Sequence, residues 1–164
     1  MTHPVMTHPV WERVQTLLRA HGIKSRELEH PAVTSAEDAA ALRGTPLAIG
    51  GKAILLRPGD KAFCLCVLSA ATELDSKLVR KALGVRRLRF ATPEELLELT
   101  GLVPGTVPPF GEPVLPFQLY ADRGMVAQPE IAFTAGRPDR SLVIAIGDYL
   151  RIAGPRVLPF ARPK

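Results

Sequence analysis

Residues 50–68 read GGKAILLRPGDKAFCLCVL, and this stretch decides what kind of fold to expect. The apolar runs 52–57 and 61–68 flank Pro58-Gly59-Asp60, a combination that favours a tight turn. Two apolar runs around such a turn predict a β-hairpin with buried strands. Cys64 and Cys66 are two residues apart, so they would face the same side of the second strand, as free thiols.

Helical and extended patterns alternate irregularly around this hairpin. Apolar spacing and helix-start signals predict helices over 10–21, 35–42, 75–83, 93–100 and 148–152. Short apolar runs predict further strands at 25–30, 85–90, 114–120, 130–134 and 140–146. Two of the helices follow capping boxes that begin at Thr34 and Thr92. This order predicts a single-domain α/β fold: a mixed, largely antiparallel β-sheet flanked by helices.

Length and composition fit one globular domain. The chain has 164 residues, of which 46% are hydrophobic and 23% charged, and no apolar run approaches the roughly 20 residues of a membrane span. The repeated MTHPV predicts a disordered leader over 1–9, before a domain over 10–153 and a basic tail over 154–164. The first residues lack the features of a signal peptide, and free buried cysteines suit a reducing compartment, so we expect a cytoplasmic protein.

Several familiar site motifs are absent from the sequence. It contains no GxGxxG, Walker A, GxSxG or HExxH pattern, and no Cys/His set with zinc spacing. We therefore expect neither a metal nor a cofactor. No nucleophile–base pair stands out either, so any catalysis would rest on positioning and electrostatics. The net charge of +5 suits an acidic partner without proving one.

Lys52 is the first candidate site residue. It follows two glycines and precedes a buried apolar run, which would place an ammonium at the mouth of a strand beside closely approaching backbone. Such a lysine could bind a phosphate or carboxyl oxygen, or polarise an ester. The alternative is a lysine at a strand end whose ammonium reaches solvent, and position alone favours it.

Two segments rich in small residues are further candidates. The Gly/Pro loop 101–111 could present backbone N–H groups to a phosphate or an oxyanion, and its Phe110 could stack on a base. The alternative is a structural loop with a buried phenylalanine. Residues 133–136, followed by Ser141, could form a pocket floor, or simply a strand end and a tight turn.

His30 and a basic cluster complete the candidates. His30 precedes Pro31 at a strand end, where it would serve as a general base or, more commonly, as a turn residue bonded to local backbone. The cluster could contact a phosphate backbone or form a solvated face, and it contains Lys77, Arg80, Lys81, Arg86, Arg87 and Arg89.

These segments occur in an order that resembles a known family. The order is His30-Pro31 with Thr34, then GKAILL (51–56), LD (74–75), LVRKALG (78–84), FATPEEL (90–96), TG (100–101), GTVPPFG (105–111), AG (135–136) and GDYL (147–150). Together they resemble the YbaK / prolyl-tRNA-synthetase-associated editing domain family. The resemblance covers about residues 25–152, and it is the order and spacing of the motifs that are specific.

The resemblance implies the mixed-sheet fold of that family and hydrolysis, in trans, of the ester of a mischarged tRNA. The tRNA would be a proline tRNA or a related one carrying a small wrong amino acid, and no metal would be needed. Lys52 matches the family's essential lysine. The loop that holds the tRNA 3′ end corresponds to Gly105, Thr106, Val107, Pro108 and Pro109, and the same site would include His30, Thr34, Thr134, Ala135 and Gly136.

In this interpretation, Lys52 anchors the terminal adenosine or its phosphate. Backbone N–H groups of Gly105–Val107 and of Gly136 clamp the 3′ end and stabilise the oxyanion. Lys77–Arg89 guide the acceptor stem.

Departures from the family pattern leave the amino acid open. Thr134 stands where the family often has Asn, and Arg137-Pro138-Asp139 stand where some alanine-specific members carry a histidine. Cysteinyl, alanyl, seryl and threonyl esters, and the ester of a small non-protein amino acid, all remain candidates. Two other hypotheses also stay open: a non-catalytic module that binds a tRNA end or a nucleotide, and a scaffold for a synthetase complex. The sequence does not specify an oligomeric state.

Overall fold

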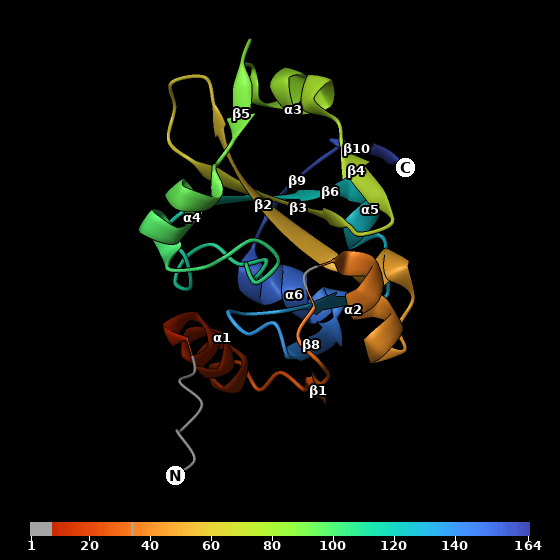
Figure 1. The fold of residues 1–164 in the computed structure, drawn as a ribbon. Helices are drawn as coiled ribbons and strands as arrows, with labels where there is room; N and C mark the ends of the chain where they lie inside the picture. Colours follow the sequence, from red (N-terminus) through yellow and green to blue (C-terminus); the bar gives the residue numbers. More distant parts are fainter. Residues whose placement is uncertain (1–7, 34) are drawn as a thin grey trace.

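A computed structural model describes residues 8–33 and 35–164 (Figure 1). Its helices are α1 (Pro9–Ala20), α2 (Ala36–Arg43), α3 (Ser76–Leu83), α4 (Pro93–Thr100), α5 (Arg123–Val126) and α6 (Ile146–Ala153), with a 3₁₀ turn η1 at Leu47–Ile49. Its strands are β1 (Arg26–Glu29), β2 (Gly51–Pro58), β3 (Cys64–Ser69), β4 (Thr72–Leu74), β5 (Leu88–Phe90), β6 (Gln118–Asp122), β7 (Glu130–Phe133), β8 (Arg140–Ala145), β9 (Arg156–Leu158) and β10 (Ala161–Pro163).

The strands form a mixed five-stranded sheet and smaller antiparallel partners, so the predicted fold class is confirmed. The large sheet has the order β5-β2-β3-β6-β9, with antiparallel pairs around β2 and parallel pairs around β6. A second sheet has the order β1-β8-β7, and β10 pairs with β4. A single bridge between Gly50 and Ala132 connects the two larger sheets at the start of β2.

The predicted hairpin is the centre of the core. Leu55, Leu65 and Val67 point to one face of the large sheet, where α1, α4 and α6 cover them. Cys64 and Cys66 point to the other face, against α3 and Phe160, as buried free thiols. Figure 1 shows α3 and α1 on opposite sides of the β2–β3 pair. Burial of apolar side chains on both faces accounts for the continuous apolar runs seen in the sequence.

Several boundaries differ from the sequence expectations. β6 begins at Gln118 because residues 114–117 form turns instead, with the N–H groups of Val114 and Leu115 donating to Gly111 O. The Thr92–Glu95 capping box of α4 is confirmed. In α2, however, the N-cap is Ser35, whose hydroxyl accepts from the N–H of Asp38. Thr34 lies outside the described residues, so its predicted cap and site role are untested.

The two ends of the chain are more structured than expected. Residues 1–7 of the predicted leader lie outside the described residues, but His8 caps α1 through Nδ1, which accepts from the N–H of Val10. Residues 154–164, expected to be a basic tail, contribute β9 and β10 to the sheets, and Phe160 is buried. The carboxylate of Asp122 fixes this segment by accepting from the N–H groups of Phe160 and Ala161. Within the described residues, no helix has both the length and the hydrophobicity that a membrane span requires.

Candidate active site

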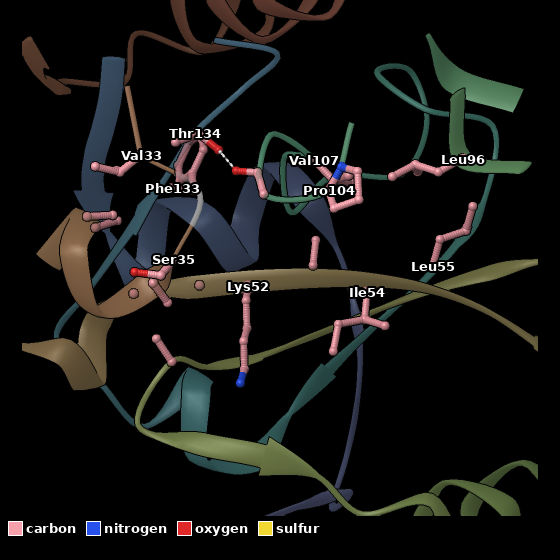
Figure 2. Close-up of a pocket in the computed structure, with 18 of the residues that line it drawn as sticks. Val33, Ser35, Lys52, Ile54, Leu55, Leu96, Pro104, Val107, Phe133 and Thr134 are labelled. Atoms are coloured by element: carbon pink, nitrogen blue, oxygen red, sulfur yellow. Dashed lines mark hydrogen bonds between the residues drawn. The ribbon is translucent and has the colours of Figure 1, made fainter. Parts of the chain in front are cut away.

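A cleft of about 400 Å³ opens along the free edge of β2 (Figure 2). β5 pairs only with Leu56–Pro58, which leaves the first part of β2 unpaired on that side. The cleft is lined by Val33, Ser35, Ala36, Ala39, Arg43, Gly50, Gly51, Lys52, Ala53, Ile54, Leu55, Ala70, Phe90, Ala91, Thr92, Pro93, Leu96, Pro104, Gly105, Val107, Ala132, Phe133 and Thr134. Of the predicted site residues, it brings together Lys52, Gly105, Val107 and Thr134.

Gly50 and Gly51 allow the start of β2 to pack closely against Ala70 and Ile131. A Cβ on Gly51 would lie 2.6 Å from Cδ1 of Ile131, and one on Gly50 would lie 3.1 Å from Cβ of Ala70. A side chain at Gly51 would therefore push β2 away from β7, and one at Gly50 would crowd Ala70. These contacts explain the two glycines by packing inside the protein, and the predicted close approach of their backbone to a ligand stays a prediction.

The Lys52 side chain leaves β2 on the face opposite the Gly/Pro loop. Neighbouring residues of a strand point to opposite faces, and Ile54, which shares the face of Lys52, packs with the α3 side of the core. Figure 2 shows Lys52 extending away from Pro104, Val107 and Thr134. The ammonium is partly buried and no carboxylate of the described residues forms an ion pair with it.

Burial lowers the pKa of Lys52, and the positive charge of Lys164 lowers it further. The carboxylates of Glu37 and Glu73 oppose this by raising it. Lys164 itself pairs with Glu37, which weakens the attraction that Glu37 exerts on Lys52. The result is an ammonium at the cleft that is less firmly protonated than an exposed lysine.

The Gly/Pro loop is tied to the end of β7 by hydrogen bonds. The hydroxyl of Thr134 donates to Gly105 O over 2.8 Å, and the N–H of Gly136 donates to Thr106 O over 2.7 Å. The N–H of Thr106 donates to Val103 O. The proposed oxyanion role of the Thr106 and Gly136 N–H groups is therefore corrected, because both are already engaged. The N–H groups of Gly105 and Val107 have no acceptor among the described residues.

The other predicted site residues lie behind the cleft or away from it. Thr106, Pro108, Pro109 and Ala135 are buried, and none of them lines the cleft. Gly136 packs against His8, whose Cβ lies 2.8 Å and whose ring Cγ lies 3.1 Å from the position that a Cβ on Gly136 would take.

The aromatic residue at the cleft is not the one that the sequence suggested. Phe110 is 1% exposed and packs edge-on against Phe133 and Tyr149, so it cannot stack on a base. Phe90 is 52% exposed and lines the cleft instead. Sequence reasoning missed Phe90 because its segment looked like an ordinary short strand.

His30 belongs to a hydrogen-bonded chain that reaches the cleft through Arg43. Its Nε2 lies 2.7 Å from the Ser141 hydroxyl, which also accepts from Nε of Arg43 over 2.7 Å. His30 itself does not line the cleft. Arg43 does, and sequence reasoning missed it because a basic residue in the last turn of a helix is ordinary.

The basic cluster lies on α3 and the segment that follows. Lys77, Lys81, Arg86 and Arg87 are exposed and Arg80 is partly buried. Arg89 is held by Glu95 through two hydrogen bonds. Across the described residues, His, Cys, Asp and Glu side chains do not gather in groups of three or more that could hold a metal ion.

Comparisons with known proteins identify relatives of this chain in sequence and in fold. A family described as the aminoacyl-tRNA editing domain matches residues 30–152. The multifunctional Ser/Thr-tRNA deacylase ProXp-y of Escherichia coli (strain K12) is 36% identical over 156 residues, covering 92% of each chain. The proline–tRNA ligase of Bordetella petrii is 32% identical over 113 residues, which are 66% of this chain and 19% of the ligase.

A solved structure agrees. A crystal structure described as a candidate trans-editing enzyme for prolyl tRNA synthetase is similar with a TM-score of 0.79 and 31% identity, over 94% of this chain and 98% of that one. The resemblance seen in the sequence is thereby confirmed. Because the family match covers three quarters of the sequence and the relative from Escherichia coli is similar over nearly all of it, this chain belongs to the aminoacyl-tRNA editing domain family.

Proposed function

We propose that this protein is a trans-acting deacylase that hydrolyses the ester of a mischarged aminoacyl-tRNA. The observation that carries the proposal is the cleft, which Lys52, Gly105 and Val107 all line in a chain of the editing family, although the Lys52 side chain leaves β2 on the face opposite the loop. Its volume of about 400 Å³ suits an acylated ribose rather than an amino acid alone. The likeness to a Ser/Thr-tRNA deacylase over 92% of both chains supports the reaction type.

Lys52 and the Gly/Pro loop would have different roles in the reaction. The Lys52 ammonium, on one face of β2, would anchor a phosphate or the ribose of the terminal adenosine. On the other face, the free N–H groups of Gly105 and Val107 would stabilise the oxyanion that forms when water attacks the ester carbonyl. Thr134 would act as a positioning residue, because its hydroxyl holds Gly105 in place.

The walls of the cleft favour a small amino acid. Ala36, Ala39, Ala53, Ala70 and Ala132 line it, so little space is taken up by side chains, and nearby Ser35 and Arg43 offer polar groups. We propose serine or threonine as the amino acid, in keeping with the name of the Escherichia coli relative. A cleft of limited size that admits the wrong amino acid and excludes larger ones follows double-sieve logic.

The proposed substrate also indicates which tRNA is bound, which basic residues contact it and where in the cell the protein acts. The tRNA would be a proline tRNA or a related one, since the relatives include a proline–tRNA ligase and a candidate trans-editing enzyme for prolyl tRNA synthetase. The exposed Lys77, Lys81, Arg86 and Arg87, together with Arg80, would contact the acceptor stem. Action on charged tRNA would place the protein in the cytoplasm, where that substrate is made and used.

A non-catalytic module that binds the tRNA 3′ end is the second candidate. The observation in its favour is that two of the N–H groups expected to form the oxyanion hole, those of Thr106 and Gly136, are occupied.

Incubation with seryl-, threonyl-, alanyl- and cysteinyl-tRNA, each corrected for spontaneous hydrolysis, distinguishes the two. Deacylation above the spontaneous rate supports the enzyme, whereas binding without release supports the module.

Lys52→Ala tests the site itself. We expect deacylation to fall to the spontaneous rate while the circular dichroism spectrum and melting temperature stay close to wild type, because Lys52 makes no ion pair that the fold needs. Lys61→Ala is the matched control, since Lys61 is exposed in the turn at the far end of the same hairpin. Wild-type turnover in Lys52→Ala would remove this lysine from the mechanism.

A further inference from the structure

Arg43 is a cation that lines the cleft but forms no ion pair with an acidic side chain in the part of the chain that the structure describes. It is the last residue of α2, and its Nη1 lies 3.9 Å from the position that a Cβ on Gly50 would take. Ala39, Gly50 and Ala132 line the cleft with it, and none of these offers a charged group. Among the described residues no carboxylate forms an ion pair with Arg43.

Two other arginines of limited exposure are paired. Arg137 holds Asp139 through two hydrogen bonds, and Arg140 holds Glu27 and Glu29. Keeping a partly buried cation without such a partner costs free energy, and burial accordingly lowers the pKa of Arg43. A group that offsets this cost when it binds is the expected counterpart.

A rigid hydrogen-bonded chain fixes one side of the guanidinium. Its Nε donates to the Ser141 hydroxyl over 2.7 Å, and Ser141 is fully buried. Nδ1 of His30 lies 2.9 Å from Pro31 O, which can only accept, so Nδ1 carries the proton. Nε2 of the same ring is hydrogen-bonded with the Ser141 hydroxyl, whose oxygen accepts from Nε of Arg43. Nε of Arg43, the Ser141 hydroxyl and both ring nitrogens of His30 therefore each have a hydrogen-bond partner.

The two Nη groups are the part of Arg43 that this chain does not use. No hydrogen bond joins them to an acceptor among the described residues. A guanidinium fixed at Nε, with its planar Nη pair unpaired at a cleft, is suited to donate to oxygen acceptors.

We propose that Arg43 binds the acylated 3′ end of the substrate, with its Nη groups donating hydrogen bonds to an oxygen acceptor inside the cleft, and that Ser141 and His30 are positioning residues for it. This inference rests on the deacylase function proposed above. The oxygen belongs either to the aminoacyl group, where a seryl or threonyl hydroxyl would be the distinguishing atom, or to a phosphate of the terminal nucleotides.

Arg43→Gln separates these two sources when assayed on the same tRNA charged with serine or with alanine. If the acceptor is the side-chain hydroxyl, kcat/KM for the seryl ester falls roughly 10- to 100-fold while the alanyl ester stays near wild type. If the acceptor is a phosphate, both esters lose a similar factor, mainly in KM, and the salt dependence of KM becomes weaker. Wild-type kcat/KM on both esters would overturn the proposal.

Two further variants guard against a purely structural effect. Arg19→Gln is the matched control, because Arg19 is likewise a basic residue in the last turn of a helix but is exposed. Ser141→Ala keeps Arg43 and removes only its anchor, so we expect the same pattern between substrates with a smaller loss. Combined with Arg43→Gln, it should add little, because both act through one group. Additive losses would contradict the positioning role.

Binding separates this proposal from the proposed function. A short single-stranded RNA that ends in a non-hydrolysable 3′-seryl-amide adenosine, an analogue that carries both candidate acceptors, is titrated into wild type and Arg43→Gln by calorimetry. If wild type hydrolyses none of the esters yet binds the analogue more tightly than Arg43→Gln does, the deacylase proposal fails and the Arg43 site stands. If the two proteins bind the analogue equally, the Arg43 site fails even where hydrolysis is observed.

Discussion

At the scale of single residues, Phe110 and Phe90 differ in their exposure at the cleft, a difference that the sequence alone does not reveal. Phe110 lies in the Gly/Pro loop that attracts attention, yet its ring is packed against Phe133 and Tyr149. Phe90 ends the short edge strand β5 and is half exposed at the cleft. An exposed aromatic ring beside a proposed nucleotide site is a stacking surface, because every base offers a π-face.

We therefore predict that Phe90→Ala weakens the use of tRNA substrates. Loss of one base-stacking contact is worth about 1–3 kcal/mol, so KM should rise roughly 5- to 100-fold with little change in melting temperature. Phe90→Tyr keeps the ring and should stay near wild type. Leu97→Ala is the control, because Leu97 is an equally exposed apolar residue that does not line the cleft. An unchanged KM in Phe90→Ala would show that no base stacks there.

At the scale of elements, two of the hydrogen bonds that hold the Gly/Pro loop differ in character. Near the cleft, Thr134 at the end of β7 donates to Gly105 O. Behind it, the hydroxyl of Tyr149 in α6 donates to Pro109 O over 2.7 Å, with Tyr149 fully buried. Burial raises the pKa of Tyr149, so this hydroxyl remains a donor throughout the physiological range. The first contact shapes the site and the second stabilises the fold.

Paired substitutions should separate these two effects. Tyr149→Phe leaves a buried carbonyl unpaired, which costs about 1–3 kcal/mol and lowers the melting temperature by roughly 2–10 °C, with kcat/KM nearly kept. Thr134→Val should lower kcat/KM more than it lowers stability, because Gly105 is freed to move. Thermal melts and deacylation assays of both variants test this. Equal effects of the two substitutions on activity would contradict the assignment of the Thr134 contact to the site and of the Tyr149 contact to the stability of the fold.

Some elements of the fold were predictable from the sequence and others were not. The β2–β3 hairpin and the Thr92 capping box were predictable because local residues determine them. β4, β9 and β10 were not predicted, because each of these three-residue strands lacks a recognisable strand pattern of its own and pairs with a partner far away in the sequence.

The residues of the candidate site also differ in whether the sequence alone could reveal them. Lys52 and Gly105 carry recognisable signals, whereas Arg43 becomes notable only when Ser141, 98 residues away, is seen to hold its Nε.

At the scale of the whole molecule, the last residues of the chain reach the proposed site. β10 pairs with β4, and Arg162 forms an ion pair with Glu73. The chain then places Lys164 against Glu37 of α2. Burial lowers the pKa of Lys52 most, and the like charge of Lys164 lowers it further, whereas Glu37 raises it.

Lys164→Ala should therefore shift the alkaline limit of activity. A lysine that must be charged to bind the 3′ end loses function as pH rises through its pKa in the folded protein, and the pKa of Lys52 lies below the usual value. Removing Lys164 deletes the repulsion and frees Glu37, so the pKa of Lys52 should rise. The alkaline decline of kcat/KM should then begin at a higher pH than in wild type.

The measurement is kcat/KM from neutral to alkaline pH, corrected at each point for spontaneous ester hydrolysis. Lys61→Ala is the control, since it removes one positive charge at the far end of the hairpin and should leave the profile in place. The substitution at Lys164 leaves the β10–β4 pairing intact, because the paired residues end at Pro163. A profile that stays unchanged, or moves to lower pH, would mean that Lys52 acts uncharged or that Lys164 does not govern its charge.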